Sequence, residues 1–195
     1  MTAWKLFDGD TPYVSTAEFH AGRDRAPHLE QPGHRERLHL AASMLRDIAS
    51  PALTFSDLGC GDGGLLSLVQ DTFGGAWGYD FCPANATGWA ERGVTATSLD
   101  VFGADKDQVR IGDVTAMTEV LEHLADPLAA LAWVRGTSRW LTCSSPHNEN
   151  DTSHAPEHAW AWDTTGYADL ITTAGWVIQR HEQTGPYQVI LASRG

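Results

Sequence analysis

The sequence of 195 residues predicts an α/β fold, in which a mostly parallel, Rossmann-like sheet carries helices on both faces. Three observations predict it. A glycine-rich turn follows the apolar, strand-like run from Thr54 to Leu58. An acidic residue, Asp80, ends the next strand-like run and lies 21 residues after Gly59. From there to the end of the sequence, strand-like and helix-like segments alternate, which is typical of parallel strands joined by helices.

The glycine-rich turn separates Leu58 from a helical pattern that begins at Leu65, and it contains Gly59, Gly61, Gly63 and Gly64. Glycine tolerates a positive φ and has no Cβ, so the chain can turn sharply and a ligand can approach its backbone. The helix that follows directs its first amide groups and its partial positive charge toward the same place. The turn therefore predicts a nucleotide-binding site.

Asp80 ends the second strand-like run, which begins at Ala76. An acidic side chain at this position can accept hydrogen bonds from two ribose hydroxyls. The alternative is that Asp80 only caps the next helix, which begins near Pro83.

The chain before the turn contains one predicted helix. Residues 1 to about 27 form an irregular arm without a clear period. A helical pattern then opens at Gln31 and ends before Pro51, and its apolar positions are Leu38, Ala41, Ala42, Leu45 and Ile48. The arm and this helix together suggest a lid over the nucleotide site.

After the glycine-rich turn, predicted strands and helices alternate along the chain, as a parallel α/β fold requires. We expect helices over residues 84–92, 127–134 and 163–174, and strands over residues 76–80, 94–98, 139–144, 176–181 and 188–192. Asp163 or Thr164 is the expected cap of the last helix, and Gly175 its stop. The turn Thr184-Gly-Pro186 joins the last two strands into an antiparallel hairpin.

Composition narrows the classes of function. The length predicts one domain. Three scattered cysteines (Cys60, Cys82 and Cys143) suit a reducing cytoplasm better than a disulfide framework. No apolar run has the length of a membrane span, and the first residues lack a signal-peptide core. The net charge of −12 disfavours a broad surface for nucleic acid, because such surfaces neutralise phosphates with lysine and arginine.

Three motifs resemble those of class I S-adenosylmethionine-dependent methyltransferases. They are Asp57-Leu-Gly-Cys-Gly-Asp-Gly63, the acidic Leu99-Asp-Val101 after a third strand, and Glu119-Val-Leu-Glu-His-Leu124 after a fourth. The resemblance covers roughly residues 36 to 195. It implies a seven-stranded, mostly parallel sheet that ends in an antiparallel hairpin. Residues 51–195 are then the S-adenosylmethionine-binding core, and residues 1–50 are an arm and a covering helix of the same domain.

The resemblance also implies which residues bind the methyl donor. Asp80 is expected to bind the ribose and Asp100 the adenine amine, while Phe81 and Val101 form apolar walls. Glu119 is expected near the methionine end or the acceptor. The full expected set is Asp57, Gly59, Cys60, Gly61, Gly63, Asp80, Phe81, Asp100, Val101 and Glu119.

Carboxylates and histidines gather in two segments that follow strands. Glu119, Glu122 and His123 are spaced so that they share one face of a helix, where two carboxylates and an imidazole can hold a divalent metal. The second segment, residues 144–162, contains His147, Glu149, His154, Glu157 and His158. The alternative is that Glu122 and His123 only hydrogen-bond the ends of loops.

The two segments together are similar to the small-RNA 3′-terminal 2′-O-methyltransferases. The resemblance implies a magnesium or manganese site formed by Glu119, Glu122, His123 and His158. Two features depart from that pattern: Ala161 stands where an acid is expected, and the chain is strongly acidic.

We therefore expect methyl transfer from S-adenosylmethionine to an oxygen or nitrogen of a small-molecule acceptor. His123 or His158 is the expected general base, and Glu119 a further catalytic candidate. The alternatives are metal-dependent methylation of the terminal ribose of an RNA, a non-catalytic S-adenosylmethionine-binding protein, and, less favoured, a nicotinamide oxidoreductase. Basic residues before Leu38 are candidates to face the acceptor: His20, Arg23, Arg25, His28, His34, Arg35 and Arg37.

Overall fold

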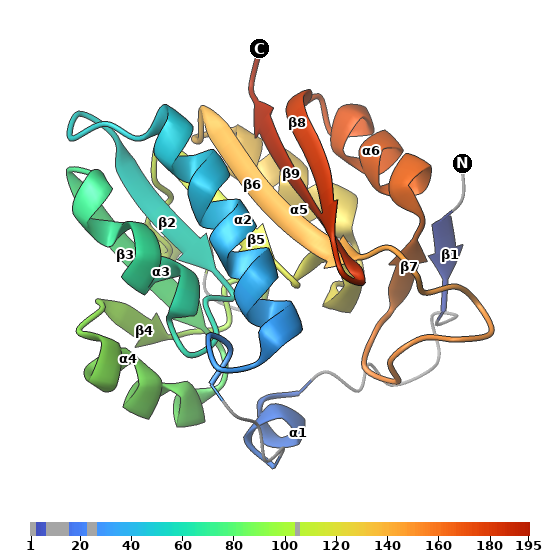
Figure 1. Ribbon diagram of the computed structural model, residues 1–195, viewed down its shortest axis with the longest axis horizontal. Coiled ribbons are helices and arrows are strands. Elements are labelled where there is room, and N and C mark those ends of the chain that lie inside the picture. Colours follow the sequence, from blue (N-terminus) through green and yellow to red (C-terminus); the bar gives the residue numbers. More distant parts are fainter. Residues whose placement is uncertain (1–2, 7–15, 23–26, 104–105) are drawn as a thin grey trace.

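The computed structural model describes residues 3–6, 16–22, 27–103 and 106–195; Arg23 and Arg25 lie outside them. Its main feature is a seven-stranded sheet in the order β4-β3-β2-β5-β6-β9-β8 (Figure 1). The strands are β2 (Thr54–Leu58), β3 (Gly75–Asp80), β4 (Ala96–Ser98), β5 (Val114–Thr118), β6 (Trp140–Pro146), β8 (Val177–Thr184) and β9 (Tyr187–Ser193). The first five are parallel, and β9 runs antiparallel to both β6 and β8. The predicted mostly parallel sheet with a final antiparallel hairpin is confirmed.

Helices cover both faces of this sheet. On one side lie α2 (Pro32–Ile48), α3 (Gly64–Val69) and α4 (Ala86–Arg92), whose apolar residues share a buried cluster with Phe55. On the other side α5 (Pro127–Arg135) and α6 (Thr164–Thr173) pack in a second cluster around Leu141. The central strand β5 is buried along its whole length, as expected for a parallel strand covered on both faces.

Most element boundaries agree with the sequence pattern to within a few residues. Asp163 caps α6, since its side chain accepts a hydrogen bond from the Gly166 amide. Strand β6 continues two residues beyond its predicted end, to Pro146, because its ladder with β9 extends to the Pro146–Tyr187 pair. No helix in the described part of the chain is both long enough and apolar enough to cross a membrane.

The prediction of an irregular arm is wrong in two places. Strand β1 (Ala3–Lys5) pairs antiparallel with β7 (Trp160–Trp162), and α1 (Ala17–Ala21) is a short helix capped by Thr16. Both elements are too short to show a period, and the partner of β1 lies more than 150 residues away in the sequence. In Figure 1, α1 lies beyond the carboxyl ends of the parallel strands.

Candidate active site

A cavity of about 680 Å³ opens at the carboxyl ends of β2, β3 and β5. Parallel α/β sheets bind ligands at this edge. Its walls come from the glycine-rich turn, the ends of these strands, the start of α2 and the loop after β6. The size suits a small-molecule site, which typically occupies about 300–1,000 Å³.

The glycine-rich turn forms one wall. Gly59 has a φ of 77°, and a Cβ built on it would lie 2.5 Å from the Cγ2 of Val120, so this position requires glycine. Gly59, Cys60 and Gly61 line the cavity, whereas Gly63 is the left-handed N-cap of α3 and is not among the lining residues. Gly63 therefore shapes the turn rather than the cavity wall. Burial raises the pKa of the Cys60 thiol well above its usual value, which disfavours a nucleophilic role.

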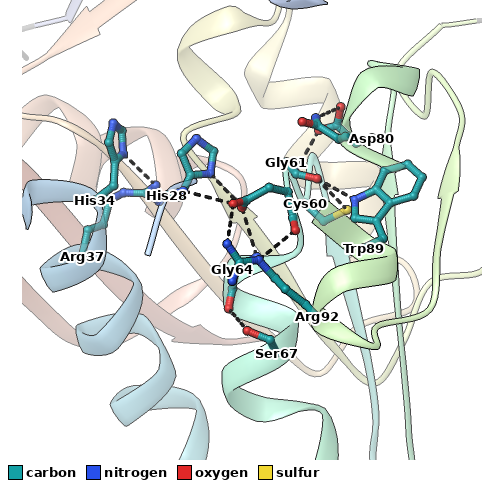
Figure 2. Close-up of polar contacts among 12 residues, drawn as sticks. His28, His34, Arg37, Cys60, Gly61, Gly64, Ser67, Asp80, Trp89 and Arg92 are labelled. Carbon is teal, nitrogen blue, oxygen red and sulfur yellow. Dashed lines mark hydrogen bonds and ion pairs between the residues drawn. The ribbon is translucent and has the colours of Figure 1, made fainter. Parts of the chain in front are cut away.

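Asp80 fastens the turn to the end of β3. Its carboxylate accepts a hydrogen bond from the Gly61 amide at 2.9 Å (Figure 2). It also accepts hydrogen bonds from the Cys82 amide at 2.8 Å and the Asn85 side chain at 2.9 Å. Asp80 thus holds the turns on both sides of it, but it is not the cap of the next helix: Cys82 is the N-cap of the 3₁₀ turn Pro83–Asn85, and Asn85 is the N-cap of α4. It also lines the cavity, where its carboxylate oxygens retain acceptor capacity.

Asp57 lies on β2 at the base of the cavity. It is fully buried, and neither carboxylate oxygen has a hydrogen-bond partner among the described residues. Burial raises the pKa of Asp57 to about 7, and the nearby Asp80 adds to this effect. A buried carboxylate without partners is unfavourable, so a cationic or hydrogen-bonding group of a ligand is the natural complement.

The replacement Asp57→Asn tests whether the pKa of Asp57 is raised, because a raised pKa makes the stability of the wild-type protein depend on pH. Asp57 titrates near 3.8 in the unfolded chain and near 7 in the fold, so wild-type stability falls as pH rises through this window. The shift corresponds to about 4 kcal/mol. We expect the melting temperature of the Asp57→Asn variant, relative to wild type, to increase from pH 5 to pH 8 without ligand. A difference in melting temperature between variant and wild type that does not change with pH would contradict the raised pKa of Asp57.

The opposite wall carries the expected adenine residues. Asp100 is exposed and accepts hydrogen bonds from the Phe102 amide at 3.3 Å and the Gly103 amide at 3.0 Å. Phe81 and the buried Val101 line the cavity with it. Three further lining residues were not identified from the sequence: Asn85, Leu99 and Phe102.

A hydrogen-bonded chain joins α2 to the end of β5. Arg37 is 2% exposed and donates to the Ser144 hydroxyl at 3.1 Å, which donates to the Glu119 carboxylate at 3.0 Å. Glu119 has a φ of 56°, which is uncommon outside glycine and often marks a functional position. Burial raises the pKa of Glu119, although the Arg37 guanidinium opposes the rise.

The other basic candidates differ in position. His20, His28 and His34 line the cavity with Arg37, and Arg35 does not. The ring of Tyr187 on β9 lies 5.3 Å from the Arg37 guanidinium carbon and also lines the cavity. Nothing in the sequence near Tyr187 identified it.

An ion-pair cluster holds the segment before α2 against the glycine-rich turn. The Asp62 carboxylate pairs with Arg92 at 2.8 Å and with the His28 ring at 3.3 Å, and it accepts a hydrogen bond from the His28 amide (Figure 2). Burial opposes ionisation of Asp62, but His28 and Arg92 hold its pKa well below the usual range. This contact keeps His28 over Gly61, within the cavity wall.

Glu122, His123 and His158 converge beside this cavity. One ligand atom from each lies within 4.8 Å of the others. Glu122 is fully buried, and within the part of the chain that the structure describes neither of its carboxylate oxygens has a hydrogen-bond partner. Burial lowers the pKa of His123 to about 3, with the neighbouring His158 and His20 adding to the effect, so the ring is neutral at pH 7. Two imidazoles and a carboxylate are a suitable donor set for a divalent metal.

The predicted helical face of the Glu119–His123 segment is wrong. Only Leu121–His123 forms a helix, a single 3₁₀ turn, and the left-handed φ of Glu119 places it outside that turn. Glu119 instead hydrogen-bonds Ser144, and the converging group in the described part of the chain does not include it. The four-residue set expected from the sequence therefore becomes three residues.

Of the three histidines in the loop after β6, only one lines the cavity. The ring of His147 lies 3.1 Å from the Gly185 carbonyl, and that of His154 lies 2.8 Å from the Ala155 carbonyl. Neither lines the cavity, whereas Glu149, Glu157 and His158 do.

Comparison with known proteins identifies the fold. The sequence matches no family model and no curated protein. The structure is similar to magnesium protoporphyrin IX methyltransferase from Synechocystis PCC 6803, which was solved with bound S-adenosylhomocysteine (SAH). The TM-score is 0.71 and the identity 16%, and the match covers 94% of this chain and 97% of that one. It is also similar to the N-methyltransferase NodS from Bradyrhizobium japonicum WM9, solved with S-adenosylhomocysteine. The TM-score is 0.72 and the identity 13%, and the match covers 93% of this chain and 97% of that one. A third similar structure is the methyltransferase domain of bacterial CtHen1-C. Its TM-score is 0.63 and its identity 19%, and the match covers 83% of this chain and 98% of that one.

These neighbours are S-adenosylmethionine-dependent methyltransferases of class I, and this chain has their fold. At such low identity the likeness describes the fold, and the reaction has to be argued from the site.

Proposed function

We propose, from this class I methyltransferase fold, that the protein transfers a methyl group from S-adenosylmethionine to an oxygen or nitrogen of a small-molecule acceptor. The observation that carries the proposal is the shared cavity: the glycine-rich turn, Asp57 and Asp80 all face it at the carboxyl ends of the parallel strands. The two neighbours solved with S-adenosylhomocysteine support the choice of donor.

In this proposal three carboxylates each bind a different part of the methyl donor. The oxygens of Asp57, which lack a hydrogen-bond partner among the described residues, complement the ammonium group in the methionine part of the donor. Asp80 accepts hydrogen bonds from the ribose hydroxyls, and Asp100 lies where the adenine amine binds. The donor then extends along the cavity toward Glu119.

The chemical step needs alignment more than activation. The sulfonium already makes its methyl group electrophilic, so the site has to hold the acceptor in line and exclude water. Removal of a proton from a hydroxyl acceptor further assists the step. His158 is the better base of the two candidate histidines, because Glu149 accepts a hydrogen bond from its Nδ1 and the low pKa of His123 makes that ring a weak base.

Calorimetric titration with S-adenosylhomocysteine, and separately with NADH, tests the choice of ligand. We expect a dissociation constant in the micromolar range for S-adenosylhomocysteine and no heat for NADH. Binding of NADH alone would favour the nicotinamide oxidoreductase instead. Binding of S-adenosylhomocysteine without turnover of any hydroxyl or amine acceptor would favour the non-catalytic binding protein.

A second candidate is metal-assisted methylation of a ribose hydroxyl at an RNA end. The convergence of Glu122, His123 and His158 favours it. The residues fit a divalent cation, because a buried carboxylate without a hydrogen-bond partner among the described residues lies beside the neutral ring of His123 and the ring of His158. Magnesium or manganese at this position would bring a Lewis acid to the hydroxyls of the acceptor.

The charge of the chain weighs against RNA, so this candidate stays second. Incorporation of methyl groups into RNA ends that stops on addition of a chelator would favour it. Turnover of a small acceptor at an unchanged rate in the presence of chelator would exclude it.

A further inference from the structure

Glu149, in the loop after β6, contacts the imidazole of His158. One carboxylate oxygen, Oε2, lies 2.5 Å from Nδ1 of His158, and both side chains are largely buried, with exposed fractions of 16% and 9%. The other oxygen, Oε1, accepts a hydrogen bond from the Ala155 amide at 3.1 Å. Since the His158 amide in turn donates to the Ala155 carbonyl, Glu149 holds both the turn before His158 and the ring itself.

This contact determines which nitrogen of the ring carries the proton. A carboxylate can only accept, so in the neutral ring the proton lies on Nδ1 and Nε2 keeps its lone pair. At His123 the Nδ1 faces the Glu157 carbonyl at 3.1 Å, and a carbonyl also can only accept. Both rings are therefore held as the same tautomer, by a carboxylate in one case and by the main chain in the other.

The loop that carries Glu149 is itself anchored on both sides. Before it, the His147 amide donates to the Pro186 carbonyl of the β8–β9 turn at 2.9 Å. After it, the Asn150 side chain accepts hydrogen bonds from the Thr152 and Ser153 amides, at 2.9 and 3.1 Å. A carboxylate on an anchored loop can orient a neighbouring ring with little loss of conformational freedom.

We propose that Glu149 is a positioning residue, which holds His158 as the Nδ1–H tautomer and presents its Nε2 lone pair toward Glu122 and His123. The role is the same whether His158 binds a divalent metal or accepts a proton from the acceptor, and in this sense it deepens the proposed function. In metal sites, such outer partners fix the tautomer and orientation of the ligand, and their loss typically lowers metal affinity about 10–100-fold.

The test uses the full chain labelled with ¹⁵N-histidine, without metal, at a pH at which the histidines are neutral. The wild-type spectrum should show His158, assigned by its loss in His158→Gln, as the Nδ1–H tautomer. In Glu149→Ala a mixture with the Nε2–H tautomer should appear. Glu149→Gln should give an intermediate result, since its amide can either accept from the ring or donate to it.

Titrations with manganese and with S-adenosylhomocysteine complete the experiment. Manganese affinity should fall at least 10-fold in Glu149→Ala, while S-adenosylhomocysteine affinity stays within about threefold and shows that the fold is intact. Asp151→Asn, which removes an exposed carboxylate from the same loop, is the matched control and should change neither.

The outcomes separate this inference from the proposed function. A wild-type His158 found as the Nε2–H tautomer, or variants whose tautomer and manganese affinity both equal those of wild type, would overturn the role of Glu149. A tautomer shift in a protein that binds no manganese would support the role and exclude the metal-assisted candidate. A tautomer shift in a protein that does not bind S-adenosylhomocysteine would support the role and refute the proposed donor.

Discussion

Replacement of Asp80 by alanine is expected to weaken binding of S-adenosylhomocysteine by about 100-fold, which corresponds to about 3 kcal/mol. Hydrogen bonds to a charged group contribute about 1.5–3 kcal/mol each, and the proposed site places two ribose hydroxyls on this carboxylate. The same carboxylate fixes the Gly61 and Cys82 amides, so its loss also loosens the wall against which the donor lies.

Calorimetry on two further variants separates these contributions. Asp80→Asn keeps an oxygen for one amide but removes the charge, so its loss of affinity should be intermediate. Asp71→Asn removes an exposed carboxylate on the 3₁₀ turn after α3 and should bind like wild type. Equal affinity of Asp80→Ala and wild type would refute the ribose assignment.

Replacement of Glu122 by alanine is expected to abolish the heat of manganese or magnesium binding. Glu122 supplies the only carboxylate in the converging group of the described residues, and its buried oxygens have no hydrogen-bond partner among those residues. Two imidazoles alone are poor ligands for these ions, which prefer oxygen donors. S-adenosylhomocysteine binding should persist, because Glu122 is not among the residues that line the cavity.

Thermal unfolding distinguishes a metal ligand from a structural residue at Glu122. Burial and the nearby Glu119 raise the pKa of Glu122 well above its usual value, so the carboxylate makes the metal-free fold less stable near neutral pH. Metal-free Glu122→Gln should therefore melt at or above the wild-type temperature, and only wild type should gain stability from added manganese. A large loss of stability in metal-free Glu122→Gln would indicate a structural role. Glu91→Gln, an exposed change on α4, is the control.

The residues proposed to bind the methyl donor were largely identifiable from the sequence as lining the cavity, because their determinants are local. The glycine-rich turn lies between two elements with clear patterns, and the acidic residue at the end of the next strand follows at a fixed distance. Of the expected donor set, every residue except Gly63 lines the cavity. Gly63 differs because the positive φ that it supplies is needed at the cap of α3 rather than at the wall.

The part of the cavity proposed to face the acceptor was predictable only in part, because its contacts join segments distant in sequence. The chain from Arg37 through Ser144 to Glu119 spans α2, β6 and the end of β5. The helical spacing of Glu119, Glu122 and His123 was visible, but spacing does not show that the segment forms only a 3₁₀ turn after a residue with positive φ.

The sequence by itself determined the α/β class, the strand that precedes the glycine-rich turn and the placement of Asp57 and Asp80, since periodicity and glycine conformation act over a few neighbouring residues. The tertiary structure alone decided that β1 pairs with β7, that Tyr187 reaches the cavity, and that Glu149 holds His158. The physical reason is that pairings between distant segments depend on how the sheet and its loops pack, which brings together side chains that no spacing in the sequence relates.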